Sequence, residues 1–192
     1  MNYSELLAAA EEYTRLGYVV IPTKDKRPTI KWTDRRGIKA TPEELQQWFG
    51  GNNNNSNVEG IGIILDKSMV AFETDGVGES VFNQKLLPNL SIGTRETYTK
   101  TTQTKSPNGH HRLFRMNTED NPHGIKEITC NLSRNKEGNG HDEIKVLSQS
   151  KYINERGPGY QKIIGIEGIV TLSKEQVTEL VPRTPQKRSW CN

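Results

Sequence analysis

The first half of the chain alternates between apolar positions with helical spacing and short continuous apolar runs. Over residues 4–16, apolar side chains recur every three or four positions, which predicts an amphipathic helix with Ser4 as its N-cap and Gly17 at its end. Residues 18–22, YVVIP, form a continuous apolar run, which predicts a short buried strand that the proline closes. The chain is therefore expected to open with a helix followed by a strand.

A second helix and a hairpin are predicted next. In residues 41–49, TPEELQQWF, Thr41 and Glu44 have the spacing of a capping box, and a proline stands at the first helical position. The apolar runs 60–65 and 69–72 are separated by a short polar turn, Asp-Lys-Ser, which favours a β-hairpin. We therefore expect these two runs to pair with each other.

The remaining residues are mostly typical of strands. The Thr- and Tyr-rich segment 96–104 and the segment HHRLFR at 110–115 flank a turn at Asn108 and Gly109, which predicts a second hairpin. The other predicted elements are a helix over 77–87, strands over 143–147, 151–155 and 160–166, and a short helix that begins with Ser173 and Gln176. The order helix, strand, helix and then mainly strands predicts an α+β fold, with a mainly antiparallel sheet and flanking helices.

Length and composition place limits on these elements. The chain has 192 residues, 32% of them hydrophobic, which allows one compact domain. It has no apolar run of the roughly 18 residues that a membrane-spanning helix needs, and Glu5, Glu11 and Glu12 argue against a signal peptide. Two distant cysteines, Cys130 and Cys191, provide no disulfide framework and no cysteine-rich zinc site. We expect a cytoplasmic protein without a membrane segment, and a monomer by default.

Basic residues gather in one segment, although the net charge of the whole chain is only +3. Residues 24–39 contain seven Lys and Arg and two Asp. Such a run is most often a solvated loop. The alternative is a surface for nucleic-acid phosphates with an aromatic ring among the cations, for which the candidates are Lys26, Arg27, Lys31 and Trp32. Composition alone leaves both interpretations open.

Two acids, Glu73 and Asp75, end an apolar run. Residues two apart on a strand point to the same face, so both carboxylates can reach one cation. Mg²⁺ prefers carboxylate oxygens, and a two-metal site for phosphoryl transfer usually needs a third acid, which Asp142 or Glu143 would supply. The alternative is a solvated strand end that runs into a turn at Gly76.

A glycine turn and two histidines follow in the segment NGHHRLF, residues 108–114. The backbone N–H groups of a tight turn at Gly109 can receive a phosphate, and His111 and Arg112 would add donors on the outgoing strand. The alternative is a hairpin whose histidines lie at the surface. The segment becomes informative through its position after the acid pair.

In their order along the chain, these segments resemble the catalytic domain of primase–polymerases, the PrimPol branch of the archaeo-eukaryotic primase superfamily. That family occurs in replication proteins of plasmids, viruses and other mobile elements. The resemblance covers most of the chain, residues 11–160. The matching segments are KRPTIKW at 26–32, TPEELQQWF at 41–49, VEGIGIIL at 58–65, ETDG at 73–76, NGHHRLF at 108–114, EIKVL at 143–147 and RGPGY at 156–160.

The resemblance implies a template-directed DNA primase and DNA polymerase with an RRM-like catalytic core. Glu73, Asp75 and Glu143 would hold two Mg²⁺ or Mn²⁺ ions, and His111 would contact the phosphates of the incoming nucleotide. On a single-stranded DNA template, the 3′-hydroxyl of a primer would attack the α-phosphate of a nucleoside triphosphate and expel pyrophosphate. Further candidates for nucleotide binding are Gly109, Arg112 and Lys145.

The same resemblance suggests a division of the chain at residue 167. Residues 1–167 would form the primase–polymerase catalytic domain. Residues 168–192 would form a C-terminal helix and a basic tail, the start of an accessory segment of the kind that often helps priming in this family. No segment resembles the helicase module of longer family members.

Two other functions remain open, the first of them because Glu73 and Glu143 stand where the family usually has aspartate. One is a nucleic-acid-binding domain without enzymatic activity, which has kept the fold while its acids drifted. The other is a rolling-circle initiator that nicks DNA with a tyrosine, for which Tyr152 would be a candidate. Such initiators bind metal through a His-hydrophobic-His pair, whereas His110 and His111 are adjacent and would point to opposite faces of a strand.

Overall fold

The computed structural model describes residues 2–51, 57–86, 88, 102–103, 109–119, 128–134, 141–149, 151–162, 169–173 and 175–177. None of its described helices is long and apolar enough to cross a membrane. The elements are, in chain order, α1 (Tyr3–Arg15), β1 (Val19–Lys24), β2 (Arg27–Pro28), the 3-10 helix η1 (Trp32–Arg35), α2 (Pro42–Phe49), β3 (Gly60–Leu65), β4 (Met69–Asp75), α3 (Gly78–Val81), the π-helical turn η2 (Phe82–Leu86), β5 (Thr102–Gln103), β6 (His110–Met116), β7 (Ile128–Arg134), β8 (His141–Leu147), β9 (Lys151–Arg156), β10 (Gln161–Lys162) and β11 (Thr171–Leu172).

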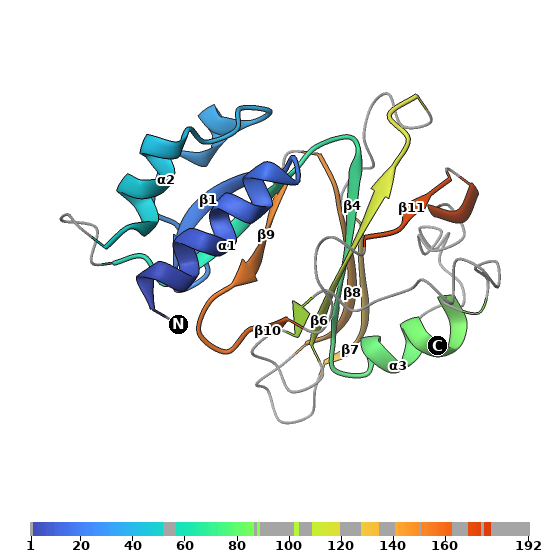
Figure 1. Ribbon diagram of the computed structural model, residues 1–192. Helices are drawn as coiled ribbons and strands as arrows, with labels where there is room; N and C mark the ends of the chain where they lie inside the picture. Colours follow the sequence, from blue (N-terminus) through green and yellow to red (C-terminus); the bar gives the residue numbers. More distant parts are fainter. Residues whose placement is uncertain are drawn as a thin grey trace.

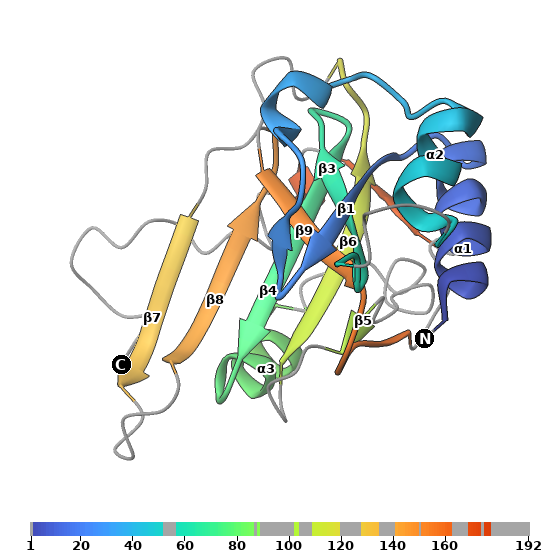
Figure 2. The same ribbon diagram turned by 90° about the vertical axis from the view of Figure 1, so that its left-hand side faces the viewer.

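The strands form two sheets, which Figures 1 and 2 show from two directions. The first sheet has the order β2-β1-β3-β9, and the second has the order β10-β5-β6-β4-β8-β7, with β11 beside β6. All described strand pairs are antiparallel except that of β11 with β6. The predicted α+β fold with a mainly antiparallel sheet is therefore confirmed, and it is compatible with a primase–polymerase fold.

The predicted hairpin between residues 60–65 and 69–72 is wrong, because the two strands belong to different sheets. β3 pairs with β1 and β9, whereas β4 pairs with β6 and β8. Both hydrogen-bonding edges of each strand are taken, so neither strand has an edge left for the other. The turn between them is held by Asp66, whose side chain accepts the Ser68 N–H at 2.7 Å, and it leads the chain into the second sheet.

The start of α1 also differs from the prediction. Asn2 is the N-cap in place of Ser4: its Oδ1 accepts the Glu5 N–H at 2.9 Å, and the Glu5 carboxylate accepts the Asn2 N–H at 3.0 Å. Asn2 has a glutamate three residues later and can form this reciprocal pair, whereas Leu7 holds the same place relative to Ser4. The end of the helix at Gly17 is confirmed, with a φ of 99° that favours glycine.

The other predicted helices are found as far as the structure describes them. The Thr41 side chain accepts the Glu44 N–H at 3.3 Å, and the Glu44 carboxylate accepts the Thr41 N–H at 2.9 Å, which closes the capping box of α2. Ser173 and Gln176 exchange the same two bonds at the start of a helical turn over residues 175–177. The helix predicted over residues 77–87 is found as α3 followed by η2.

Some predicted strands differ in extent. β1 continues past Pro22 to Lys24, because the Pro22 carbonyl still accepts the Thr29 N–H at 3.0 Å across the β1–β2 hairpin. Of the predicted strand 96–104, β5 is described and pairs antiparallel with β6, as the second hairpin requires. The turn at residues 104–108 and the continuation of β10 over residues 163–166 lie outside the described residues.

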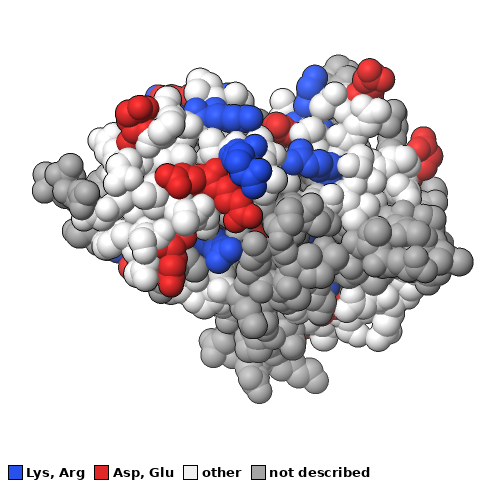
Figure 3. Space-filling view, viewed as in Figure 1, with Lys and Arg blue, Asp and Glu red and all other residues white. Residues whose placement is uncertain are grey.

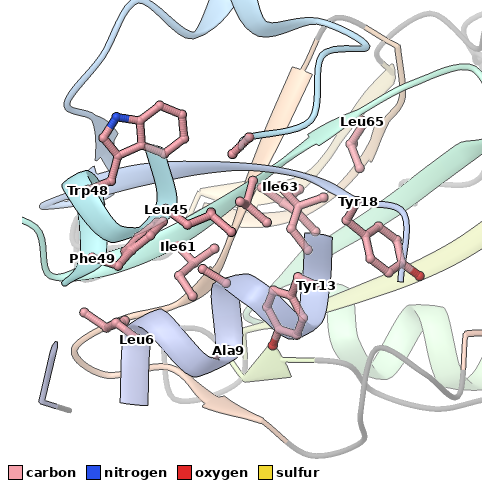
Figure 4. Close-up of a cluster of buried hydrophobic side chains, with 14 of the residues drawn as sticks. Leu6, Ala9, Tyr13, Tyr18, Leu45, Trp48, Phe49, Ile61, Ile63 and Leu65 are labelled. Carbon is pink, nitrogen blue, oxygen red and sulfur yellow. The ribbon is translucent and has the colours of Figure 1, made fainter. Parts of the chain in front are cut away.

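The main hydrophobic core lies between the helices α1 and α2 and the first sheet, as Figure 4 shows. α1 contributes Leu6 and Tyr13, α2 contributes Phe49, and β3 contributes Ile61 and Ile63. The same core reaches the near face of the second sheet through Ala71, Leu113 and Leu147. The two sheets and the two helices therefore share one apolar interior.

A second core covers the far face of the second sheet. The ring of Phe72 packs edge-on against Phe82 and Phe114, at centroid distances of 5.4 and 5.8 Å. β4 is thus enclosed from both sides along its apolar half. Its burial ends at Glu73 and Asp75, which are only half-buried. The strand emerges from the interior at its acidic end.

Candidate active site

Three neighbouring strands bring the predicted acids and His111 to one face of the second sheet. Glu73 on β4 lies opposite His111 on β6 and opposite Lys145 on β8, and Asp75 lies opposite Glu143. Directly opposite residues of antiparallel strands share a face, with Cβ atoms about 4.5–5.5 Å apart. We call these five residues the acidic face.

The other carboxylates of the acidic face make it harder for Asp75 to ionise. Burial raises the pKa of Asp75 above its ordinary value, and the charges of Glu73 and Glu143 raise it further. Lys145 and His111 oppose the rise without cancelling it. The site therefore holds more negative charge than its own cations balance, and a divalent cation would relieve the repulsion.

The pKa of Glu73 is shifted in the opposite direction, downward. Burial works against its ionisation, but the hydrogen bond and charge of His111, together with the charges of Lys145 and Lys26, outweigh it. The pKa of Glu73 consequently lies below its ordinary value. With 26% of its side chain exposed, Glu73 is a carboxylate at neutral pH that remains open to solvent on one side.

The donor set of the acidic face fits a hard divalent cation, since Glu73, Asp75 and Glu143 offer the oxygen ligands that Mg²⁺ and Mn²⁺ accept. The carboxylates are not yet gathered around one point: within the described residues, no three His, Cys, Asp or Glu side chains are grouped to hold an ion. Lys145 lies among them instead, and its Nζ donates to the Glu143 carboxylate. Burial lowers the pKa of Lys145, but Glu143, Glu73 and Asp75 raise it above its ordinary value.

His111 is held in place by a strand of the other sheet. Its Nδ1 donates to the backbone carbonyl of Asn154 on β9 at 3.0 Å, which leaves Nε2 facing the Glu73 carboxylate at 3.5 Å. The ring of Tyr160 lies 5.9 Å from the His111 ring. Sequence reasoning missed Asn154, and it had no signal to use, because a backbone carbonyl is the same for every residue type.

Asp142 and Glu143, the two candidates for the third acid, lie in different environments. Glu143 faces Asp75, whereas the Asp142 Oδ1 accepts the Val77 N–H at 2.9 Å. Asp142 thereby supports the turn that follows β4. At Gly76 in that turn, φ is 58° and an added Cβ would lie 1.9 Å from the Asp142 Oδ1, so only glycine fits beside it. The geometry assigns Asp142 to the turn and Glu143 to the acidic face.

Arg112 does not join the acidic face, because it points to the opposite side of β6. Its side chain is completely buried; it donates to the Thr74 Oγ1 at 2.8 Å and to the Glu79 carboxylate, and its guanidinium lies 4.5 Å from the centre of the Phe82 ring. His110 is on the same side, with its Nδ1 3.2 Å from the Glu79 Oε2. Sequence reasoning missed Glu79, because a single acid on a short helix carries no pattern.

Gly109, another candidate for nucleotide binding, is buried directly before β6. Its position next to the strand that carries His111 agrees with the predicted hairpin. The turn that would present its neighbouring N–H groups to a phosphate lies outside the described residues. The structure therefore places Gly109 near the acidic face without describing the whole turn.

Lys26 approaches the acidic face from the first sheet. Asp25 and Lys26 form the two-residue loop between β1 and β2, with left-handed φ values of 48° and 66°. The Lys26 carbonyl accepts the Tyr152 hydroxyl at 3.2 Å and the Asn154 Nδ2–H at 3.1 Å, which holds this strained loop against β9. The Lys26 Nζ lies 5.9 Å from the centre of the Tyr160 ring. The loop thus aims a cation toward His111 and Glu73.

A small open hollow lies where this loop meets the end of β9. Its lining includes Lys26, Asn154, Arg156 and Tyr160, of which Asn154 and Tyr160 also contact His111. Burial, and after it the charges of nearby acids, raise the pKa of Tyr160, so its hydroxyl stays neutral. The hollow therefore adjoins the acidic face, and its wall holds two cations, Lys26 and Arg156, beside two acids, Asp25 and Glu59.

Two of the remaining candidates, Arg27 and Trp32, lie on the face of the first sheet that is turned away from α1 and α2. There Trp32 packs against the core of Val19, Ile21 and Ile64. Its ring meets the Tyr152 ring edge-on at 5.2 Å, and the Arg36 guanidinium lies 5.2 Å from its centre. We call Arg27, Trp32, Arg36 and Tyr152 the aromatic-basic surface.

Lys31 is directed elsewhere, since its Nζ pairs with the exposed Asp34 at 2.9 Å. Arg27 is exposed, and its positive charge opposes the rise that burial causes in the pKa of Tyr152. On the face seen in Figure 3, which carries α1, the described acidic and basic side chains lie intermixed. The helical side therefore offers no continuous basic surface among the described residues in view.

A family model of known proteins matches most of the chain. No curated protein matches the chain. The family model described as "Bifunctional DNA primase/polymerase, N-terminal" matches residues 10–164, which include every residue of the acidic face. The match also includes β1 to β10, and therefore every strand of both sheets except β11. The chain thus belongs to the family of bifunctional DNA primase/polymerase N-terminal domains, whose members are generally metal-dependent.

Proposed function

We propose that this chain is a template-directed DNA primase and polymerase, which transfers a nucleotidyl group from a nucleoside triphosphate to a 3′-hydroxyl and releases pyrophosphate. The observation that carries the proposal is the register of β4 with β6 and β8, which places Glu73, Asp75 and Glu143 on one face beside His111. The family match supports the reaction class.

Glu73, Asp75 and Glu143 would hold the divalent ions, Mg²⁺ or Mn²⁺, because they are the carboxylates of the acidic face and Asp75 is repelled by the other two. Bound there, such ions would neutralise charge on the attacking oxygen and on the triphosphate. The acids themselves contribute position, since the pairing of Asp75 with Glu143 across β4 and β8 sets the distance between two of the ligands.

His111 and Lys26 would bind the triphosphate. His111 is oriented by the Asn154 carbonyl, and Lys26 is held by a loop whose carbonyl accepts two bonds from β9. The His111 ring is therefore oriented, and the backbone of Lys26 is held in place, before a nucleotide arrives. Such positioning favours catalysis by charge neutralisation. We assign Arg112 to the folded structure instead, because it is buried against Glu79 on the far side of the sheet.

The primary test is extension of a labelled primer on a single-stranded template, with all four dNTPs and either Mg²⁺ or Mn²⁺. We expect extension that chelation of the metal abolishes. Failure to extend with either metal, combined with retained DNA binding, would support the non-enzymatic alternative. Unprimed template with labelled nucleotides separately measures priming. A covalent adduct of DNA with Tyr152 would support the rolling-circle alternative, although His110 and His111 lie on opposite faces of β6.

The third acid can be tested with a matched pair of variants. Glu143→Gln is expected to lower the rate of primer extension about 10²–10³-fold, the usual cost of removing one charge-stabilising group from an active site. Asp142→Asn is expected to stay within about threefold of wild type, because an amide oxygen can still accept the Val77 N–H. Steady-state extension rates of the two variants decide which acid is the third metal ligand. A large loss in Asp142→Asn with little change in Glu143→Gln would assign Asp142 as the ligand.

We further propose that the aromatic-basic surface binds the single-stranded template. Stacking of one base on an aromatic side chain contributes about 1–3 kcal/mol, so Trp32→Ala is expected to weaken binding of an oligothymidylate roughly 5- to 150-fold. Trp32→Phe keeps an aromatic ring over Val19 and Ile21 and should retain most of the affinity. Fluorescence anisotropy at one fixed salt concentration measures the affinity of both variants for the oligothymidylate. Wild-type affinity of a folded Trp32→Ala variant would rule this surface out.

A further inference from the structure

Lys145 occupies a position that a surface lysine would not normally take. It lies two residues after Glu143 on the same face of β8, directly opposite Glu73, and its Nζ donates to the Glu143 carboxylate. Only 29% of its side chain is exposed. Partial removal of an ammonium group from water costs free energy unless nearby negative charge compensates for it. Here three carboxylates supply that compensation.

The acidic face depends on Lys145 in turn. The cations that act on Glu73 are His111, Lys145 and Lys26, whereas Glu143 has Lys145 as its ion-pair partner among the described residues. Without Lys145, the Glu143 end of the face would keep its carboxylates and lose its nearest positive charge. Mutual repulsion would then be strongest between Glu143 and Asp75, which are direct neighbours across the two strands.

We propose that Lys145 is a resident counter-ion of the acidic face: its ammonium group neutralises the three carboxylates in the metal-free protein and leaves them when a divalent ion binds. This inference rests on the proposed metal site and adds that Lys145 and the divalent ion compete for it. The lysine and the divalent ion need the same carboxylate oxygens. Lys145 therefore stabilises the metal-free protein and lowers its affinity for metal.

The competition separates this role from that of a simple nucleotide ligand. A lysine that only bound phosphate would affect the affinity for nucleotide and would leave metal binding unchanged when no nucleotide is present. A counter-ion affects metal binding in the absence of any nucleotide. It also affects the stability of the protein before metal is added. Both quantities can be measured without an activity assay.

The experiment titrates Mn²⁺ alone, without nucleotide or DNA, into five proteins by calorimetry at one ionic strength. They are the wild type, Asp75→Asn, Lys145→Gln, Lys145→Arg and Lys39→Gln, the last of which removes the same charge as Lys145→Gln from an exposed position outside the acidic face. We expect Lys145→Gln to bind Mn²⁺ about tenfold more tightly than the wild type, a difference of about 1.4 kcal/mol. Lys39→Gln should match the wild type, and Lys145→Arg, which keeps the charge, should bind no more tightly.

Thermal melting without metal gives the second readout. Lys145→Gln should melt at a lower temperature than the wild type, and added Mn²⁺ should raise its melting temperature by more. A Lys145→Gln protein that folds only with Mn²⁺ would also support the proposal. Unchanged or weaker Mn²⁺ binding by Lys145→Gln, alongside weakened binding by Asp75→Asn, would overturn the counter-ion role and leave the metal site intact. Equal Mn²⁺ binding by the wild type and Asp75→Asn would overturn both.

Discussion

Replacement of Glu73 and Asp75 by alanine together is expected to lower the rate of primer extension on the order of 10³-fold or more, because it removes two of the three carboxylates that charge stabilisation would depend on. The two residues share one face of β4, so no other acid on that strand can substitute for them. The loss should appear in the maximal rate with saturating nucleotide, since the effect is on the reacting groups and not only on substrate affinity.

The double variant should still fold. Burial and two neighbouring carboxylates already raise the pKa of Asp75, so its charge is a cost to the metal-free protein, and its removal relieves repulsion. A double variant of Glu11 and Glu119, both exposed and distant from the acidic face, provides a control with the same change in charge. Extension at the wild-type rate by the Glu73 and Asp75 variant would show that these acids do not hold the reacting groups.

Glu79→Ala is expected to lower the free energy of unfolding by about 3–5 kcal/mol, the usual cost of leaving one member of a buried ion pair without its partner. The Arg112 side chain is fully buried and that of Glu79 is 13% exposed, so water cannot replace the lost carboxylate. Burial lowers the pKa of Arg112, and Glu79 opposes that shift. Urea denaturation of the metal-free protein measures the change.

Two further variants make this result specific. Glu11→Ala removes an acid from the exposed side of α1 and should change stability by less than about 0.5 kcal/mol. Combining Glu79→Leu with Arg112→Met removes both charges and should recover much of the loss, as apolar replacements of buried ion pairs often do. A loss below about 1 kcal/mol in Glu79→Ala would mean that Arg112 finds compensation elsewhere, and its assignment to the folded structure would need revision.

Local signals in the sequence were sufficient to locate α1, α2 and α3 and to place Glu73 and Asp75 on one face of a strand. The capping box of Thr41 and Glu44 and the glycine at position 17 act over three or four residues, so their effect does not depend on the rest of the chain. The shared face of Glu73 and Asp75 follows from the two-residue period of a strand. The same period separates Arg112 from His111, and it could have excluded Arg112 from the nucleotide site in advance.

Local signals in the sequence could not predict which distant strands pair with each other. The sequence predicted a hairpin between residues 60–65 and 69–72, because proximity along the chain favours it, but each strand found partners more than 35 residues away on at least one edge. Hydrogen bonding between strands is nearly independent of side-chain identity, so the apolar runs alone cannot choose among partners.

The sequence by itself therefore determined the helices, the apolar strands and the types of side chain that could bind metal and phosphate. Only the tertiary structure decided that Glu143 faces Asp75 while Asp142 supports a turn, that a carbonyl of β9 orients His111, and that Lys145 lies among the acids. The physical reason is the same for all three. Each depends on the register between strands that are far apart in the chain, and a shift of one residue would reverse the face of every side chain.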